Sequence, residues 1–334
     1  MAEHTDISST EALAWVDEQL AQASYRRTAE PEIARQTVWS LVWRIETDNG
    51  PVYFKAASDS LRHEAAVTQA LPDWAERQVP RVLASDVARG WLLLADAGVM
   101  LRTLLTHQPN PSGHLHALLP KYVQFQQAMA EHSHQLLALK APDRRLTTLP
   151  SLYDGLIADE TMLTLGQTEH HEDSLSLEQI DRLHALSRRF QELCDELAAF
   201  GIPQTLHHDD FHDGNIFVQD GQYIFMDWAE CAVAHPFFSM NVFLRSANYR
   251  LDLEQHDLDA LRDTYLSAWE LDLSPADLMR AWDVSQVLAT FCRALTWYAI
   301  TKDLPPAIKA EEGMSVPGWL GEFLEAVKQL DEGT

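Results

Sequence analysis

The chain has little cysteine, and this limits the kinds of scaffold it can form. Its 334 residues include only three cysteines, Cys194, Cys231 and Cys292, which are widely spaced and odd in number. Such a set predicts neither a disulfide framework nor a CxxC metal site. We therefore expect three buried free thiols in a chain that folds without cross-links.

Basic residues are also scarce. The sequence has 25 lysines and arginines against 50 aspartates and glutamates, which gives a formal net charge of −25 at pH 7. A surface this acidic repels nucleic-acid phosphates, so neither DNA nor RNA is an expected partner. The excess of acid serves either solubility or the attraction of a cationic substrate.

Long apolar runs are absent. No segment approaches the ~18 apolar residues of a membrane span, and the N-terminus is acidic and lacks the apolar core of a signal peptide. We expect a soluble, cytoplasmic protein with no membrane partner, either a monomer or a homodimer. With 46% hydrophobic residues, the chain has enough apolar surface for a sizeable core and more than one lobe.

The first 97 residues mix helix and strand. Apolar residues at helical spacing predict a helix over 9–22, and a second follows at 60–71. Between them, β-branched and aromatic residues flank Asn49-Gly50, a strong hairpin signal. The expected strands are 37–47, 51–56, 79–83 and 91–94. Residues 1–97 are predicted to form a small lobe with an antiparallel sheet.

Beyond Gly98 the pattern is helical almost throughout, so residues 98–334 are predicted to form a larger, mainly helical lobe. The fold class is therefore α+β, with two lobes. The expected helices are 99–107, 115–140, 153–163, 177–200, 240–249, 254–271, 275–302 and 316–331.

Ionisable residues are concentrated between Leu206 and Trp228. Asn215 begins one apolar strand and Asp227 ends the next, so a hairpin brings the two side chains together. An amide oxygen and a carboxylate suit Mg²⁺ when a nucleotide supplies the other ligands. Asp210 lies just upstream in a loop, where it could orient a hydroxyl group.

A lysine and a glutamate in the small lobe suggest a phosphate contact. Strand alternation puts Val52 and Phe54 on one face of the hairpin, with Tyr53 and Lys55 on the other. Glu64 follows on the next helix and can pair with the lysine. Such a pair presents an ammonium group to phosphate oxygens.

The same stretch allows a different interpretation. The run HHDDFHD from position 207 resembles a histidine and aspartate metal cluster, as in a metal-dependent phosphohydrolase. Further ligands would then come from His132 and His134, or from His170 and His171.

The order of these residues resembles the aminoglycoside phosphotransferase and choline kinase-like family, whose fold is similar to that of protein kinases. The family motif is His-Gly-Asp, four residues and Asn, followed by an Asp on the next strand. Here it corresponds to the stretch from His208 to Asn215 and to Met226-Asp227-Trp228. The resemblance covers about residues 30 to 300.

The resemblance implies a role for each residue. Asp210 would be the catalytic base or would orient the acceptor hydroxyl, with His208 supporting its loop. Asn215 and Asp227 would hold Mg²⁺. Lys55, fixed by Glu64, would contact the phosphates of ATP, with GTP as an alternative.

The sequence departs from the family pattern at two places. Asp209 stands where the motif has glycine, and an extra carboxylate there would raise the pKa of Asp210 or bind a cation. No glycine-rich loop precedes Lys55, so phosphate contacts would come from backbone amides or from Gln36, Thr37 and Ser40.

The acceptor is expected to be a small-molecule alcohol, and an amine-bearing one would suit acidic residues such as Glu230 and Asp159. The family includes aminoglycoside, macrolide, choline-like, amino-sugar and homoserine acceptors, and the resemblance does not choose among them. A kinase-like binding protein without catalysis is the remaining alternative.

Overall fold

The computed structural model describes residues 9–106 and 112–333, and within them the chain forms two compact units. No helix in these two ranges is long and apolar enough to cross a membrane. The first unit contains the chain up to His114, together with His134–Ala141 and His212–Cys231. The second contains Leu115–Ser133, Pro142–Phe211 and the chain from Ala232 onward.

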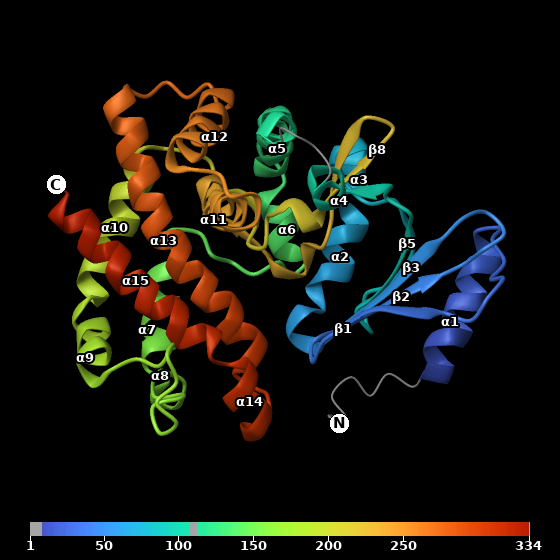
Figure 1. Cartoon of the computed structure of the whole chain (residues 1–334), viewed down its shortest axis with the longest axis horizontal. Helices are drawn as coiled ribbons and strands as arrows, with labels where there is room; N and C mark the ends of the chain where they lie inside the picture. Colours follow the sequence, from blue (N-terminus) through green and yellow to red (C-terminus); the bar gives the residue numbers. More distant parts are fainter. Residues whose placement is uncertain (1–8, 107–111, 334) are drawn as a thin grey trace. The chain divides into compact units, whose positions relative to one another are not determined.

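A five-stranded antiparallel sheet forms the centre of the first unit (Figure 1). Its strand order is β1-β2-β3-β5-β4, so that β3 and β5 are interior strands. The strands are β1 (Glu32–Gln36), β2 (Ser40–Ile45), β3 (Val52–Ala57), β4 (Val82–Asp86) and β5 (Trp91–Ala95). The predicted antiparallel sheet is therefore confirmed, and β1 is a strand that the sequence pattern did not predict.

Two helices cover opposite faces of this sheet, α1 (Ser9–Gln22) and α2 (His63–Ala70) (Figure 1). The core under α1 includes Phe54 of β3 and Trp91 and Leu93 of β5. The core on the α2 side includes Leu92 and Leu94 of β5. Val52 and Phe54 share one face of β3, as predicted; this face packs against α1, and alternation leaves Lys55 on the α2 face.

The hairpin of β2 and β3 is confirmed, with Ile45 opposite Val52 and Val42 opposite Lys55. The first strand is shorter than the predicted 37–47, because β2 begins at Ser40 and ends at Ile45, and Thr47 forms only an isolated bridge with Arg27. Gly50 takes a φ of 92°, which the turn requires and which glycine adopts without strain.

A smaller three-stranded sheet, with the order β6-β8-β9, completes the strands of the first unit. Helix was predicted over 99–107, but Val99 and Met100 pair with β8, and His107 lies outside the described residues. Gly98 precedes this strand at φ 89°, where an added Cβ would lie 2.4 Å from the carbonyl oxygen of Val218. The remaining elements here are α3 (Pro72–Ala75), β6 (Val99–Met100), α4 (Leu101–Thr106), α6 (Ser133–Ala138), β8 (Ile216–Gln219) and β9 (Gln222–Phe225).

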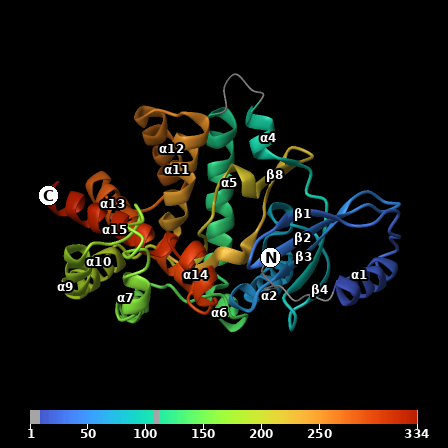
Figure 2. The ribbon, with the colours of Figure 1, turned by 60° about the horizontal axis from the view of Figure 1, so that its bottom comes forward.

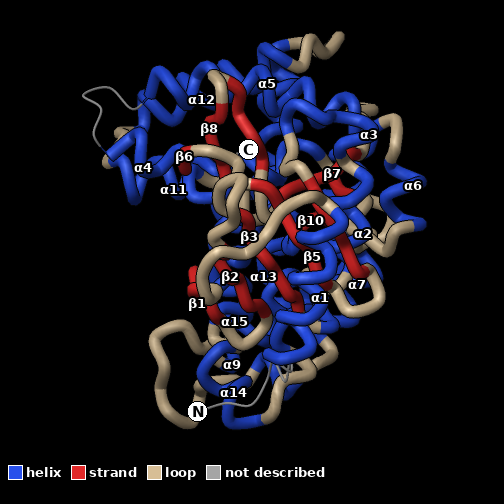
Figure 3. The backbone as a smooth tube through the Cα atoms, turned by 90° about the vertical axis from the view of Figure 1, so that its right-hand side faces the viewer, coloured by secondary structure: helices blue, strands red, loops and turns tan. Residues whose placement is uncertain are grey.

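The second unit is mainly helical, as predicted. Two of its longer helices, α13 and α15, pack against each other, and α11 contacts both α12 and α13 (Figure 2). Strands β7 (Thr205–His208) and β10 (Cys231–Ala234) form a separate two-stranded sheet (Figure 3). The helices are α5 (Ser112–Ala130), α7 (Leu149–Ile157), α8 (Glu160–Leu163), α9 (Leu177–Ala185), α10 (Ser187–Ala199), α11 (Ser239–Leu251), α12 (Gln255–Ala268), α13 (Pro275–Thr301), α14 (Pro306–Glu312) and α15 (Ser315–Glu332).

Two long helices that the periodicity predicts are each interrupted. The segment 115–140 divides into α5 and α6, and 177–200 divides into α9 and α10 at Leu186. Apolar periodicity continues through both interruptions because each following helix still buries a face. The sequence pattern therefore located the buried faces correctly and missed the breaks.

Candidate functional site

Lys55 is the centre of a buried ion-pair cluster in the first unit. Its ammonium group donates to Glu64 Oε1 and to Asp227 Oδ1, each at 2.6 Å. Lys55 comes from β3, Glu64 from the first turn of α2, and Asp227 from the end of the β8–β9 hairpin. The structure therefore brings together three of the residues that the sequence singled out, over a separation of up to 172 positions.

The charges of this cluster depend on one another. Burial alone would lower the pKa of Lys55, but Asp227 and Glu64 reverse this effect and hold it above its ordinary value. Burial raises the pKa of Glu64 to about 7, against the opposing effect of Lys55. The lysine is thus charged, and Glu64 gains or loses its proton near neutral pH.

Asn215 and Asp227 lie at adjacent ends of β8 and β9. Ile216 pairs with Phe225, and the amide of Met226 donates to the carbonyl oxygen of Asn215 at 2.8 Å. Asp227 then takes a left-handed conformation, with φ 62° and ψ 67°. This conformation costs most residues ~1–2 kcal/mol, and aspartate is among the residues that adopt it more readily. It turns the chain out of the strand immediately after Met226.

The donor atoms present fit Mg²⁺ held jointly with a nucleotide. Asp227 offers a carboxylate, one third exposed, and Asn215 offers an amide oxygen. Hard cations take such oxygen ligands, and Mg²⁺ usually completes its shell with phosphate and water. In the ranges that the structure describes, no group of three or more His, Cys, Asp or Glu residues is placed to bind a metal ion.

Asp210 belongs to the second unit and follows strand β7. Its amide donates to His208 Nδ1 at 3.2 Å, and its Oδ1 accepts from Arg293 Nη2 at 3.1 Å. His208 is fully buried, and its ring therefore ties the backbone of the loop to the end of β7. The carboxylate of Asp210 is about one fifth exposed.

Asp209 is buried among polar partners from three parts of the second unit. It accepts from His207 Nε2 at 2.9 Å and from the hydroxyl of Thr296, and Arg144 lies 3.4 Å away. Arg293 Nη1 lies 3.6 Å from the same carboxylate. Burial alone would raise the pKa of Asp209, but His207 and the two arginines hold it well below its usual range.

Other ionisable residues between Leu206 and Trp228 form hydrogen bonds and ion pairs within the fold. Asp213, in the first unit, accepts from Arg102 Nη2 at 2.7 Å, and His212 Nδ1 accepts from the amide of Gly214 at 2.9 Å. In the second unit, His207 Nδ1 accepts from the hydroxyl of Ser239 at 2.9 Å. These histidines and this aspartate therefore stabilise the loops around the predicted site.

Ser40, Asp159 and Glu230 were also predicted to lie at the site. The amide of Ser40 donates to the hydroxyl oxygen of Thr37 at 3.0 Å, which closes the turn between β1 and β2. Asp159 caps α8 through the amide of Met162 and accepts from the hydroxyl of Tyr298 at 3.1 Å. Glu230 ends a short 3₁₀ turn, Trp228–Glu230, directly after Asp227.

Two arginines lie near Asp227 and Asp210, and the sequence analysis predicted neither. Arg35 lies on β1, and its Nη1 is 4.0 Å from Asp227 Oδ2, with the side chain 60% exposed. Arg293 lies on α13 and contacts Asp210. An arginine on an edge strand carries no pattern of its own, whereas Arg293 lies within an apolar run, where a buried partner was to be expected.

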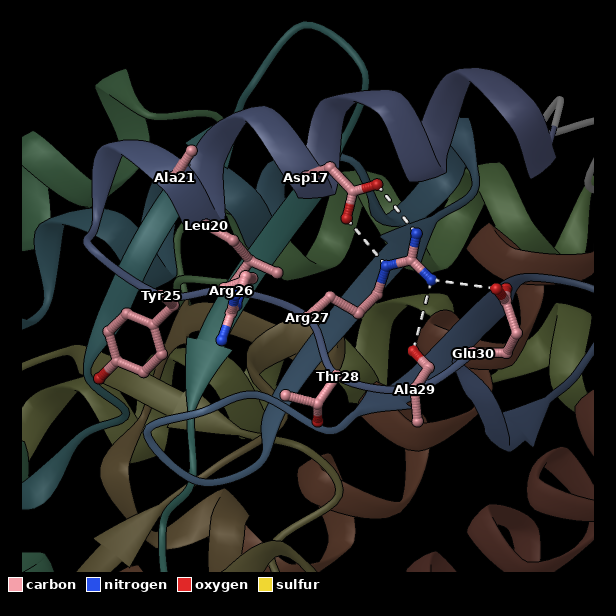
Figure 4. A pocket seen from close by; sticks show the side chains of 9 residues that line it. All are labelled: Asp17, Leu20, Ala21, Tyr25, Arg26, Arg27, Thr28, Ala29 and Glu30. Atoms are coloured by element: carbon pink, nitrogen blue, oxygen red, sulfur yellow. Dashed lines mark hydrogen bonds and ion pairs between the residues drawn. The ribbon is translucent and has the colours of Figure 1, made fainter.

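Two surface hollows among the described residues are lined by other side chains. One of about 490 Å³ lies beside α1, where Arg27 is bound by Asp17 at 2.8 Å and by Glu30 at 3.4 Å (Figure 4). The charge of the Arg27 guanidinium group is therefore already balanced by these two carboxylates. A second, of about 580 Å³, is lined by residues of α11, α13 and α15.

Comparison with known proteins gives one family. Residues 34–283 match the phosphotransferase enzyme family, which is three quarters of the chain. None of the curated proteins matches it.

Several solved structures share the fold over nearly the whole chain. The ethanolamine kinase of Plasmodium vivax has 11% identity and a TM-score of 0.58, covering 89% of this chain and 84% of that one. A ternary complex of APH(2″)-IIa with streptomycin and ATP has 12% identity and a TM-score of 0.58, covering 95% and 96%. A macrolide 2′-phosphotransferase type I has 12% identity and a TM-score of 0.54, covering 95% and 98%. At such low identity these similarities establish the fold, which is protein kinase-like.

Proposed function

Because the chain belongs to the phosphotransferase enzyme family, we propose that this small-molecule phosphotransferase moves the γ-phosphate of ATP to a hydroxyl group of its acceptor. The observation that carries the proposal is the buried cluster of Lys55, Glu64 and Asp227. A lysine held by two carboxylates, one of them suited to bind a metal ion, is an arrangement that supports phosphoryl transfer. GTP remains the alternative nucleotide.

The cluster has a defined task in this proposal. Lys55 contacts phosphate oxygens, while Glu64 fixes the position of its ammonium group. Bound Mg²⁺, held by Asn215 and Asp227, would neutralise developing charge on the phosphates. Arg35 lies close to Oδ2 of Asp227 and is a further cation for the phosphate chain. It would compensate for the missing glycine-rich loop, since the Thr37 hydroxyl already accepts the amides of Trp39 and Ser40.

Asp210 acts on the acceptor. Its carboxylate accepts a hydrogen bond from the attacking hydroxyl, orients that group and takes its proton as the bond to phosphorus forms. His208 stabilises the loop because its Nδ1 accepts a hydrogen bond from the Asp210 amide. Positioning and charge neutralisation account for most of the rate enhancement in reactions of this kind.

The acceptor is proposed to carry an amine. The support is the net charge of −25 and Glu230, which lies three positions after Asp227. Asp159 is a weaker candidate than the sequence suggested, because it caps α8 and binds Tyr298. Streptomycin and ethanolamine, named with two of the similar structures, are both amine-bearing.

The test is a screen of ATP consumption over amino alcohols, amino sugars and antibiotics, with product detected by mass spectrometry. We expect transfer to at least one hydroxyl, and Asp210→Ala should reduce kcat by ~10²–10⁴-fold. Asp181→Ala, on the exposed side of α9, is the matched control.

Two results would count against the proposal. Transfer that survives in Asp210→Ala would remove Asp210 from the mechanism. Binding of Mg-ATP without transfer to any acceptor would favour a kinase-like binding protein.

A further inference from the structure

The position before Asp210 holds an aspartate where the family motif has glycine, and the structure explains how it is accommodated. The backbone of Asp209 does not take a positive φ, so the conformational freedom of glycine is not needed there. The side chain is only 3% exposed, so its charge must be balanced inside the unit.

The balance comes from two arginines far away in sequence. Arg144 and Arg293 are themselves 6% and 8% exposed, and both lie near Asp209 Oδ2. With Asp210 they form a group of two cations and two anions. If residue 209 were glycine, two buried guanidinium groups would face one carboxylate, which is a costly arrangement. Asp209 and the arginines therefore depend on each other.

Arg293 bridges the two adjacent aspartates. Its Nη1 donates to the carbonyl oxygen of Asp209 at 3.3 Å, and its Nη2 donates to Asp210 Oδ1 at 3.1 Å. Its guanidinium carbon lies 5.6 Å from the ring centre of Trp297. A planar guanidinium group with several partners has little conformational freedom. The hydrogen bond from Nη2 therefore fixes the position of the Asp210 carboxylate.

We infer that Asp209 and Arg293 are positioning residues that together fix the direction of the Asp210 carboxylate. The inference rests on the proposed function, in which that carboxylate orients the acceptor hydroxyl. Misplacement of a reacting group by about 1 Å can cost ~10²-fold in rate. Asp209 thus acts on the reaction through Arg293 and without touching the substrate.

The test uses the full chain and steady-state kinetics of the acceptor identified in the screen. Arg293→Lys keeps the charge but cannot donate to both aspartates at once. We expect it to lower kcat by ~10–100-fold and to leave the KM for ATP within about threefold, because Lys55 and Asp227 are untouched. Arg280→Lys, on the same helix and paired with Glu196, is the matched control.

Chemical rescue separates positioning from mere folding. In Arg293→Ala, millimolar guanidine is expected to restore part of kcat by refilling the space between the aspartates. Guanidine should not rescue Asp210→Ala. Asp209→Asn should lower kcat like Arg293→Lys, and its circular dichroism spectrum shows whether it folds. If it does not, the lysine and alanine variants of Arg293 decide the matter.

The outcomes distinguish the inference from the function on which it rests. If the wild-type enzyme transfers phosphate and Asp210→Ala does not, but Arg293→Lys keeps full kcat, the positioning role is wrong and the function stands. The positioning role also fails if Arg293→Ala loses activity without rescue by guanidine. A wild-type chain that transfers no phosphate to any acceptor overturns both.

Discussion

Removal of the buried ammonium of Lys55 should give a loss of stability that grows with pH. In the wild-type chain, Lys55 donates to Glu64 and Asp227 at 2.6 Å each. Lys55→Met keeps most of the side-chain volume and removes the charge. Glu64 is then left buried with a carboxylate as its nearest charged neighbour, and it must either lose hydration as an anion or retain a proton.

The sign follows from the pKa of Glu64. Burial raises it from 4.5 to about 7, Lys55 lowers it and Asp227 raises it. A carboxyl group with a raised pKa in the folded state contributes stability below its unfolded pKa, which is lost as pH rises through the folded pKa. Without Lys55 the folded pKa rises further, so the loss continues above pH 7 in the variant after it has ended in the wild type.

The magnitude follows from proton linkage. Each pH unit in this window costs the variant ~1.4 kcal/mol relative to the wild type. Between pH 7 and pH 8.5 the difference in unfolding free energy should therefore widen by ~2 kcal/mol. Below pH 7 it should stay constant with respect to Glu64, because the carboxyl is protonated in both proteins.

The assay is urea denaturation at several values between pH 6 and pH 8.5, without nucleotide or Mg²⁺. Lys55→Met/Glu64→Gln has no titrating group at position 64, so its difference from the wild type should not widen. Lys302→Met removes a lysine from an exposed pair with Asp303 and serves as the surface control.

A difference between wild type and Lys55→Met that is equal at pH 6 and pH 8.5 would refute the reasoning. Equal widening in the double variant would also do so, since another group would then be the one that titrates.

Three further changes test Asp227, Arg35 and the buried His235. Asp227→Asn should lower kcat by at least ~10²-fold, whereas Asp220→Asn, also left-handed and in the turn of the same hairpin, should be neutral in the same transfer assay. Arg35→Ala should weaken ATP binding by ~10-fold and leave adenosine binding unchanged by calorimetry; equal loss for both ligands would remove Arg35 from phosphate binding. Burial lowers the pKa of His235 from 6.5 to about 3, so the wild type should lose stability as pH falls below 6.5, by up to ~2 kcal/mol at pH 5. His235→Asn should lose less in thermal melts from pH 7 to pH 5, and a parallel decline would show that His235 is not responsible.

The features of the site that the sequence predicted depend on residues close together in the chain. Alternation along β3 put Lys55 on the face opposite Phe54, and the structure confirms this. The apolar pattern around Asn215 and Asp227 predicted a hairpin that brings the two residues together, and the register of β8 and β9 does so. Both inferences needed only the period of a strand and one turn.

The sequence did not predict polar contacts that join distant segments. The amide of Ser40 is bound to Thr37 within the turn, and the contact of its side chain with phosphate stays a prediction. The strand β1, which carries Arg35, has no buried position and hence no apolar alternation to reveal it. Side-chain contacts of this kind follow from the packing of the whole unit, which local patterns do not contain.

The pairing of Asp209 with Arg293 could have been predicted from the sequence. The sequence suggested that this carboxylate raises the pKa of Asp210 or binds a cation, and the structure places it beside the guanidinium groups of Arg293 and Arg144. Arg293 lies in the run Val-Leu-Ala-Thr-Phe-Cys-Arg-Ala-Leu from Val287 to Leu295, whose residues are all buried. An arginine at such a position requires an anion inside the fold. An anion that replaces glycine in a buried loop requires a cation in turn. Each of the two residues is anomalous alone, and the pairing that removes both anomalies also places a guanidinium group on the carboxylate proposed to carry out the chemistry.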